Sequence, residues 1–177
     1  MKKIFLTALL ILSFLNSTQA EEVKKSSLKI TDINGKSYTV TGTKEGLKIS
    51  GMEGKVVFLE FFGHRCPPCL ASIPHFIDLQ KKHKDKLAIV AVEVQGLSET
   101  QLKNFVKEKK MNYTVISGEK ERLFVSYISE RSQWIEQWRG SIPFLLVLDG
   151  KGDVQYIQAG MLPESSLEEI FQQLSKK

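Results

Sequence analysis

The chain has two cysteines, and both lie in one short segment, Cys66-Pro67-Pro68-Cys69. The apolar run over residues 56–62 has the length and composition of a buried strand, and the residues from Pro67 onward are typical of a helix. A strand that delivers two cysteines to the first turn of a helix is suited to thiol–disulfide exchange. A structural staple is the alternative, but a disulfide stabilises a fold mainly through the loop that it closes, and this loop is very short. The segment therefore predicts a redox-active pair.

The N-terminal residues predict export. Two lysines are followed by an apolar stretch that is too short to cross a bilayer comfortably, and then by small residues that end at Ala20. We interpret residues 1–20 as a signal peptide cleaved near Ala20, and residues 21–177 as one folded domain. An uncleaved membrane anchor is the less favoured alternative. The expected location is the bacterial periplasm, an oxidising compartment in which protein disulfides form and persist.

Charge and residue spacing argue against several kinds of partner. The net charge is +5 at pH 7, but the lysines are interleaved with acidic residues, so no nucleic-acid surface is predicted. His64 and His75 do not stand at metal-binding spacing from the cysteines, so no metal site is predicted. No cofactor is predicted either. We expect a monomer, because the sequence contains no exposed heptad pattern and no long unpaired apolar edge.

The apolar periodicity predicts an α/β fold. Residues 28–40 alternate apolar and polar side chains on both sides of Asn34-Gly35, which is typical of a β-hairpin. Further strands are predicted over residues 56–62, 87–94, 113–116, 142–148 and 154–159. Helices are predicted from about Pro67, after the N-cap Ser98, over residues 119–138, and over a closing segment that ends near Leu174. Strands that alternate with helices form a sheet that is covered on both faces.

Four marks in this order make the chain resemble the thioredoxin superfamily: the strand that ends in Phe61-Phe62, the cysteine pair, Pro74 within the following helix, and Ile142-Pro143 before a strand. The N-terminal hairpin and a central strand–helix insertion are similar to the exported TlpA/ResA branch. The resemblance implies a thioredoxin-like fold, with a central mixed sheet flanked by helices. It also implies a thiol:disulfide oxidoreductase that acts on client proteins and is kept reduced by a membrane thiol partner.

The two cysteines are predicted to have different roles. Cys66 would be the attacking nucleophile, because the positive end of the helix favours its thiolate. Pro67 and Pro68 carry no amide hydrogen, so the amide of Cys69 becomes the main donor to the Cys66 sulfur. Arg65 would add positive charge if its side chain points inward, and a solvated arginine is the alternative. Cys69, one turn further into the helix, would be the buried resolving thiol.

Glu60 is the third residue predicted to take part in the chemistry. Its strand neighbours are apolar on both faces, so the position is expected to be buried, and a buried carboxylate must protonate or find a partner. The resemblance implies that an acid six residues before the first cysteine exchanges a proton with the resolving cysteine, which requires a raised pKa. The alternative is a glutamate that reaches water at the end of the strand.

Substrate contacts are predicted around Ile142-Pro143. The resemblance implies a cis proline here, which leaves the backbone of Ile142 free to pair with an extended substrate segment. The alternative is a trans proline that opens an edge strand. Trp134, Ile135 and Trp138 precede this loop, and Trp138 is the residue that we assign to a substrate groove. Because aromatic residues at helical spacing are more often core, a core position is the alternative.

The sequence leaves the direction of exchange open. We expect a reductant, for which cytochrome c maturation is one use. Members of the family with that use commonly carry a glutamate three residues after the second cysteine, where this chain has Ser72. The alternative is a disulfide-introducing oxidant or isomerase of the DsbA type, because small differences in dithiol stability decide the direction. A non-catalytic binding module and a soft-metal chaperone are less favoured.

Overall fold

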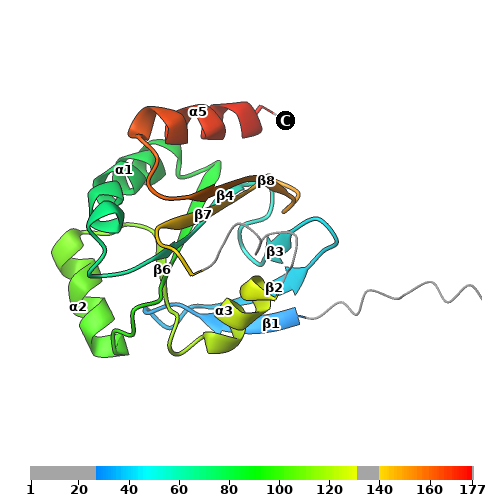
Figure 1. Cartoon of the computed structure of the whole chain (residues 1–177). Coiled ribbons are helices and arrows are strands. Elements are labelled where there is room, and N and C mark those ends of the chain that lie inside the picture. Colours follow the sequence, from blue (N-terminus) through cyan, green and yellow to red (C-terminus); the bar gives the residue numbers. More distant parts are fainter. Residues whose placement is uncertain (1–26, 131–139, 177) are drawn as a thin grey trace, which may run out of the picture.

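The computed structural model describes residues 27–130 and 140–176 of the chain (Figure 1). The predicted signal peptide and Trp138 therefore lie outside the described residues. Within the described ranges, none of the helices has the length and apolar character that crossing a membrane requires.

The centre of the fold is a five-stranded sheet with the strand order β6-β5-β4-β7-β8. Its strands are β4 (Val56–Phe62), β5 (Leu87–Glu93), β6 (Thr114–Ser117), β7 (Phe144–Leu148) and β8 (Val154–Ala159). Strands β4, β5 and β6 are parallel, whereas β7 is antiparallel to both β4 and β8. Every residue of β4 is buried, because the strand is central and both faces of the sheet are covered.

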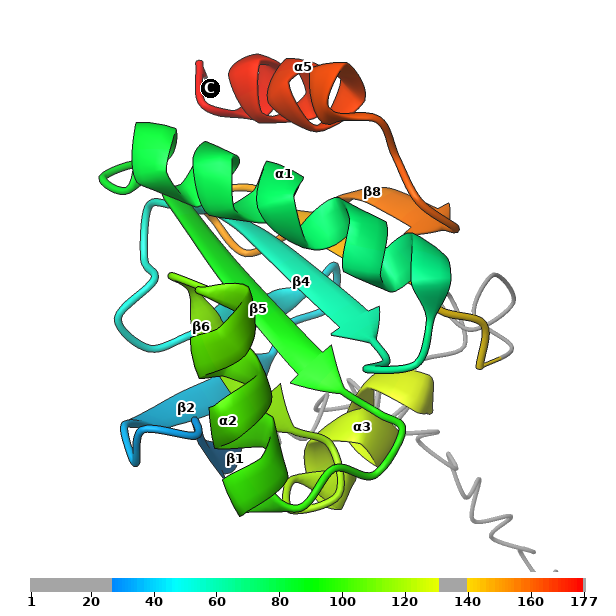
Figure 2. The same ribbon diagram turned by 90° about the vertical axis from the view of Figure 1, so that its left-hand side faces the viewer.

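Three helices cover one face of the sheet: α1 (Pro67–His83), α2 (Glu99–Lys109) and α5 (Glu164–Leu174) (Figure 2). Their apolar stripes pack onto alternate residues of β4, with Ile73 of α1, Leu102 of α2 and Phe171 of α5 in the same core cluster as Phe58. Helix α2 begins where the sequence predicts it, because the Ser98 side chain accepts a hydrogen bond from the Gln101 amide in a capping box.

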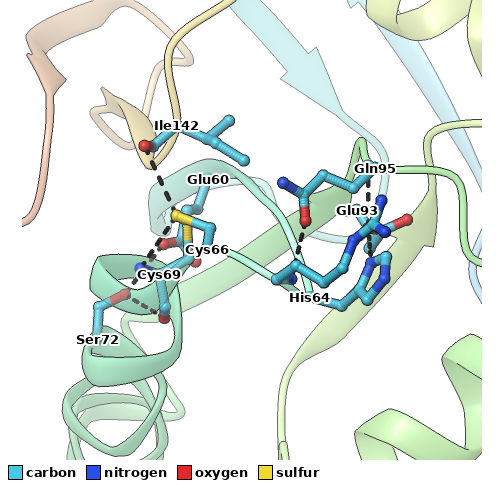
Figure 3. The surroundings of a disulfide bond; sticks show 9 residues. Glu60, His64, Cys66, Cys69, Ser72, Glu93, Gln95 and Ile142 are labelled. Carbon is cyan, nitrogen blue, oxygen red and sulfur yellow. Dashed lines mark hydrogen bonds and ion pairs between the residues drawn. A yellow bond between two sulfur atoms is a disulfide. The ribbon is translucent and has the colours of Figure 1, made fainter.

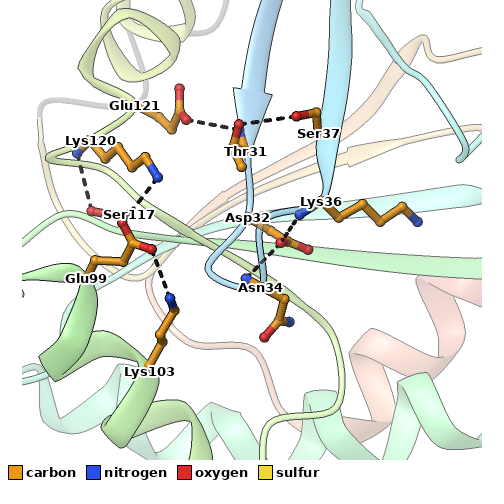
Figure 4. A network of polar contacts seen from close by, with 10 residues as sticks. All are labelled: Thr31, Asp32, Asn34, Lys36, Ser37, Glu99, Lys103, Ser117, Lys120 and Glu121. Carbon is orange, nitrogen blue, oxygen red and sulfur yellow. Dashed lines mark hydrogen bonds and ion pairs between the residues drawn. The ribbon is translucent and has the colours of Figure 1, made fainter.

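A second layer covers the opposite face. It consists of a small antiparallel sheet and one helix: β1 (Ser27–Thr31), β2 (Ser37–Gly42), β3 (Leu47–Ile49) and α3 (Arg122–Ser129). The predicted hairpin is formed by β1 and β2, and the carboxylate of Asp32 accepts the amides of Asn34 and Lys36 in the turn (Figure 4). The amide of Thr31 donates to Glu121 at 2.9 Å, which joins the hairpin to the start of α3.

The predicted elements agree with the observed ones except for one missed strand, one shortened helix and several strand ends: β7 starts at Phe144 rather than at residue 142, and β5 ends at Glu93 rather than at residue 94. Strand β3 was not predicted, since three residues are too few for a periodic signal. Strand β6 starts one residue later than predicted. The helix predicted over residues 119–138 begins at Arg122, after a turn, and α3 ends at Ser129; residues 131–139 lie outside the described residues.

The contact between α1 and α5 leads to a prediction about acid stability. Glu168 of α5 accepts hydrogen bonds from Gln172 at 2.7 Å, from the ring of His83 at 3.0 Å and from Lys82 at 3.1 Å. Burial raises the pKa of Glu168, but these three hydrogen bonds outweigh it and lower the pKa to about 2. A lowered pKa in the folded state stabilises the fold above the unfolded-state pKa, and this contribution is lost as the pH falls toward 2.

We therefore expect Glu168→Gln to lower the free energy of unfolding at pH 7 by about 1–2 kcal/mol. Urea unfolding between pH 7 and pH 2 measures this, and the difference from the unchanged protein should disappear at the acidic end. Glu169→Gln is the matched control, because Glu169 is exposed on the same helix and accepts a hydrogen bond from the side chain of Gln173 one turn away. An equal loss in both variants would contradict the prediction.

Candidate active site

The two cysteines form a disulfide at the N-terminus of α1 (Figure 3). Cys66 is the N-cap residue and follows the loop that leaves β4, while Cys69 lies in the first helical turn. The two sulfurs differ in accessibility, because Cys66 retains 7% of its surface and Cys69 none. Of the two cysteines, only Cys66 therefore has any exposed surface.

The helix N-terminus contacts the Cys66 sulfur directly. The amide of Cys69 donates to Cys66 Sγ at 3.4 Å, which confirms the predicted donor. Pro67 and Pro68 occupy the first two helical positions and are exposed. Because neither has an N–H, the Cys69 amide is the first free donor that the helix can turn toward the sulfur.

The Ile142–Pro143 peptide bond is cis, as the resemblance implied. The carbonyl oxygen of Ile142 lies 3.7 Å from Cys66 Sγ, so this loop and the disulfide face each other although 76 residues separate them in the chain. The carbonyl of Pro143 accepts the amide of Gly160 at 2.8 Å, which ties the loop to the end of β8. Trp138, assigned to the same region by sequence, lies outside the described residues.

Glu60 is buried in the middle of β4, with 2% of its surface exposed. Its neighbours on the adjacent strands are Ala91 and Leu145, and neither can neutralise a charge. Burial raises the pKa of Glu60 to about 8, and the hydrogen bond from Ser72 opposes this rise. The expected burial is confirmed, and the carboxyl group is mostly protonated at pH 7.

The hydroxyl group of Tyr113 is also buried near Glu60. The Tyr113 hydroxyl has no hydrogen-bond partner among the described residues. Burial, followed by the charge of Glu60, raises the pKa of Tyr113 well above its usual value. Tyr113 therefore stays neutral, whereas the raised pKa of Glu60 lies close to neutral pH.

Ser72 links Glu60 to the cysteine helix. Its hydroxyl oxygen lies 3.3 Å from Glu60 Oε1 and 2.9 Å from the carbonyl oxygen of Cys69 (Figure 3). A hydroxyl has one hydrogen, so it can donate fully to only one of these acceptors. A protonated Glu60 can donate to Ser72, which then donates to Cys69. When Glu60 is ionised, the Ser72 hydrogen is drawn toward the carboxylate instead.

In the sequence, Ser72 stands out only as a departure from a family pattern. The available signal was its position three residues after Cys69, which places it one turn further along α1 on the side that faces β4.

Arg65 is exposed, which agrees with the solvated alternative rather than with an inward-pointing charge. Within the described part of the chain, no group of three or more His, Cys, Asp or Glu residues is arranged to hold a metal ion.

The chain matches the AhpC/TSA family over residues 22–157. It is 29% identical over 133 residues to the Thioredoxin-like protein YneN of Bacillus subtilis, which covers 74% of this chain and 71% of the relative. It is 26% identical over 147 residues to the Thiol-disulfide oxidoreductase ResA of Bacillus cereus, with 82% and 73% covered.

Solved structures share the fold. A thiol:disulfide interchange protein of the thioredoxin family from Chlorobium tepidum has a TM-score of 0.66 at 23% identity, covering 85% of this chain and 94% of its own. StoA from Bacillus subtilis has a TM-score of 0.60 at 20% identity, with 82% and 96% covered. The exposed lipoprotein thioredoxin Etrx1 of Streptococcus pneumoniae has a TM-score of 0.61 at 22% identity, with 84% and 100% covered. These likenesses confirm the predicted thioredoxin-like fold.

Proposed function

Since the chain belongs to the AhpC/TSA family and is a thiol-disulfide oxidoreductase like its ResA relatives, we propose that it reduces disulfides of client proteins outside the cytoplasm. The observation that carries the proposal is the asymmetry of the pair: Cys66, beside the Ile142 carbonyl, retains some exposed surface, and Cys69 retains none.

The reaction consists of two exchanges. The Cys66 thiolate attacks a client disulfide, one client thiolate leaves, and a mixed disulfide joins Cys66 to the client. The Cys69 thiolate then attacks Cys66 Sγ, and the second client thiolate leaves. Two electrons pass from the dithiol to the client, and the enzyme ends with the Cys66–Cys69 disulfide.

Glu60 acts in the second exchange as the base for Cys69. A buried thiol is a poor nucleophile until it loses its proton, and Glu60, which Ser72 links to the backbone of Cys69, has a raised pKa that suits a base for this thiol. In the reverse direction, the protonated Glu60 returns the proton to Cys69. Ser72 holds the carboxyl group against the helix turn that carries Cys69.

The Ile142 backbone binds the client. An extended client segment pairs with this backbone as an added strand and brings its disulfide to Cys66, 3.7 Å from the Ile142 carbonyl. Pro67 and Pro68, both exposed, border the same approach to the sulfur. Among the other residues assigned by sequence, Arg65 is exposed, and Trp138 remains a prediction.

The electron balance of the reaction indicates what kind of partner the protein needs. Each turnover leaves the pair oxidised, so a reductant in an oxidising compartment needs a continuous electron supply. We assign this supply to a thiol partner in the membrane. The N-terminal sequence, with its predicted cleavage site near Ala20, supports export to the periplasm. We expect the protein to work there as a monomer.

The reduction potential of the pair tests the direction of exchange. We expect a value more negative than about −220 mV, between those of glutaredoxins and of structural disulfides. Equilibration with glutathione mixtures, followed by mass spectrometry of alkylated thiols, measures it. A value near that of DsbA, about −120 mV, would make the protein an oxidant. A pair that exchanges with neither glutathione nor a protein disulfide would remove the proposed function altogether.

A further inference from the structure

The carboxylate of Glu93 is buried at the end of β5, and all of its acceptor positions are occupied. One oxygen accepts the amide of Gln95 and lies 2.9 Å from Nδ1 of His64; the other accepts the amides of Gly96 and Leu97 at 3.1 and 3.0 Å. Only 1% of Glu93 is exposed. Four hydrogen bonds offset the desolvation of a carboxylate, so this group is built to remain in place.

The loop that follows β5 also binds Arg65, the residue directly before Cys66. The side chain of Gln95 accepts the amide of Arg65 at 2.8 Å. It also packs against Gly63 so closely that a Cβ atom on Gly63 would overlap with it. The amide of Cys66 donates to the carbonyl of Gly63 at 3.2 Å, which closes the turn that leads into α1.

Strand register explains why residues about thirty positions apart meet here. Strands β4 and β5 are parallel, and Phe62, the last residue of β4, is paired with Glu93, the last residue of β5. The two following loops therefore leave the same edge of the sheet side by side (Figure 3). One of them carries Glu93 and Gln95, and the other carries His64, Arg65 and Cys66.

We infer that Glu93 and Gln95 are positioning residues for Cys66, because they lock the loop at residues 63–65 in the conformation that makes Cys66 the N-cap of α1. As N-cap, the Cys66 sulfur receives the Cys69 amide and the positive end of the helix, and both favour its thiolate. A loosened loop lets Cys66 leave this position. The inference rests on the proposed function, since it concerns the nucleophile of that reaction.

Gln95→Met tests the inference, because it keeps the bulk of the side chain and removes the acceptor for the Arg65 amide. We expect reduced Cys66 to react about tenfold more slowly with iodoacetamide at pH 7, because the thiolate is the reacting form and a rise of about one unit in the thiol pKa lowers its population about tenfold below that pKa. The midpoint of the alkylation rate against pH should move upward. The equilibrium with glutathione should shift toward the disulfide, because the thiolate form is less favoured.

Gln95→Glu is the conservative rescue, because a carboxylate oxygen can still accept the Arg65 amide. Measured in about 1 M salt, where the added charge is screened over about 3 Å, its alkylation rate should stay within about twofold of the unchanged protein. Gln101→Ala is the matched control: it removes a 3.0 Å side-chain bond to the Ser98 amide in the α2 cap, away from Cys66. It should lower thermal stability without moving the alkylation midpoint.

Glu93→Gln is the stronger variant, and Glu121→Gln, which affects one backbone contact far from the cysteines, is its control. If Glu93→Gln unfolds the protein, the Gln95 variants alone decide. An unchanged alkylation midpoint and glutathione equilibrium in Gln95→Met would overturn the inference. Because these readouts use small reagents, they remain measurable even if the protein reduces no client and the proposed function fails.

Discussion

Replacing Cys66 with serine is expected to abolish disulfide exchange completely. A hydroxyl does not attack a disulfide, and the remaining thiol of Cys69 has no exposed surface from which to do so. Reduction of a model protein disulfide such as that of insulin should fall to the rate without enzyme. Circular dichroism should show an intact fold, since Cys66 lies at the edge of the core and a disulfide that encloses only two residues contributes little stability.

Cys69→Ser gives the complementary result. This variant can still form the mixed disulfide through Cys66 but cannot resolve it, so covalent complexes with clients should accumulate. Non-reducing gels and mass spectrometry of material recovered from cells would detect them. If Cys66→Ser traps clients and Cys69→Ser does not, the roles of the two cysteines must be exchanged.

Replacing Glu60 with glutamine is expected to change the pH dependence of the reaction. In the unchanged protein, resolution of the mixed disulfide should accelerate as the pH rises toward 8, because the carboxylate that accepts the Cys69 proton becomes populated. Without the carboxylate, resolution at pH 8 should be about a hundredfold slower. Stopped-flow measurement on a Cys66–glutathione mixed disulfide between pH 5 and 9 isolates this step.

Glu60→Gln should also change how stability depends on pH. A raised pKa means that the folded state binds more protons than the unfolded state, so the free energy of unfolding falls as the pH rises from about 4.5 to about 8. The largest possible loss is roughly 5 kcal/mol, since one pKa unit corresponds to about 1.4 kcal/mol. Glutamine does not titrate, so the variant should become progressively more stable than the unchanged protein over this range.

Two further variants test whether the pH dependence of resolution comes from Glu60. Ser72→Ala keeps the carboxyl group but removes a hydrogen bond that lowers its pKa, so the pH midpoint of resolution should move upward. Glu169→Gln, on the exposed side of α5, should leave both the rate profile and the pH dependence of stability unchanged. A Glu60→Gln rate profile that coincides with that of the unchanged protein would rule out the proton transfer.

Local patterns were sufficient to predict most of the fold. An unbroken apolar run predicts β4, a serine cap predicts α2, and Asn34-Gly35 predicts the first hairpin, because each signal lies within a few neighbouring residues. The burial of Glu60 follows from its apolar strand in the same way. The cis peptide came from a family resemblance, since the residues around Pro143 carry no local signal for it.

Contacts between distant segments could not be predicted. Glu93 looks like an ordinary glutamate at the end of a strand, and only the register of β4 against β5 brings it to His64. Ser72 acquires its role because α1 crosses above Glu60, which sequence spacing does not specify. Such contacts depend on the relative placement of whole elements, whereas helices and strands depend on residues that are close in the chain.

The complete burial of Cys69 has a consequence for oxidative damage. A peroxide can reach only Cys66, and it would convert that thiolate to a sulfenic acid. The sulfenic acid then condenses with the Cys69 thiol beside it and loses water, which yields the same disulfide that a normal turnover leaves behind. Because this product is a regular state of the cycle, any reductant that restores the dithiol would also reverse the oxidation, before a further step to the sulfinic acid makes it irreversible.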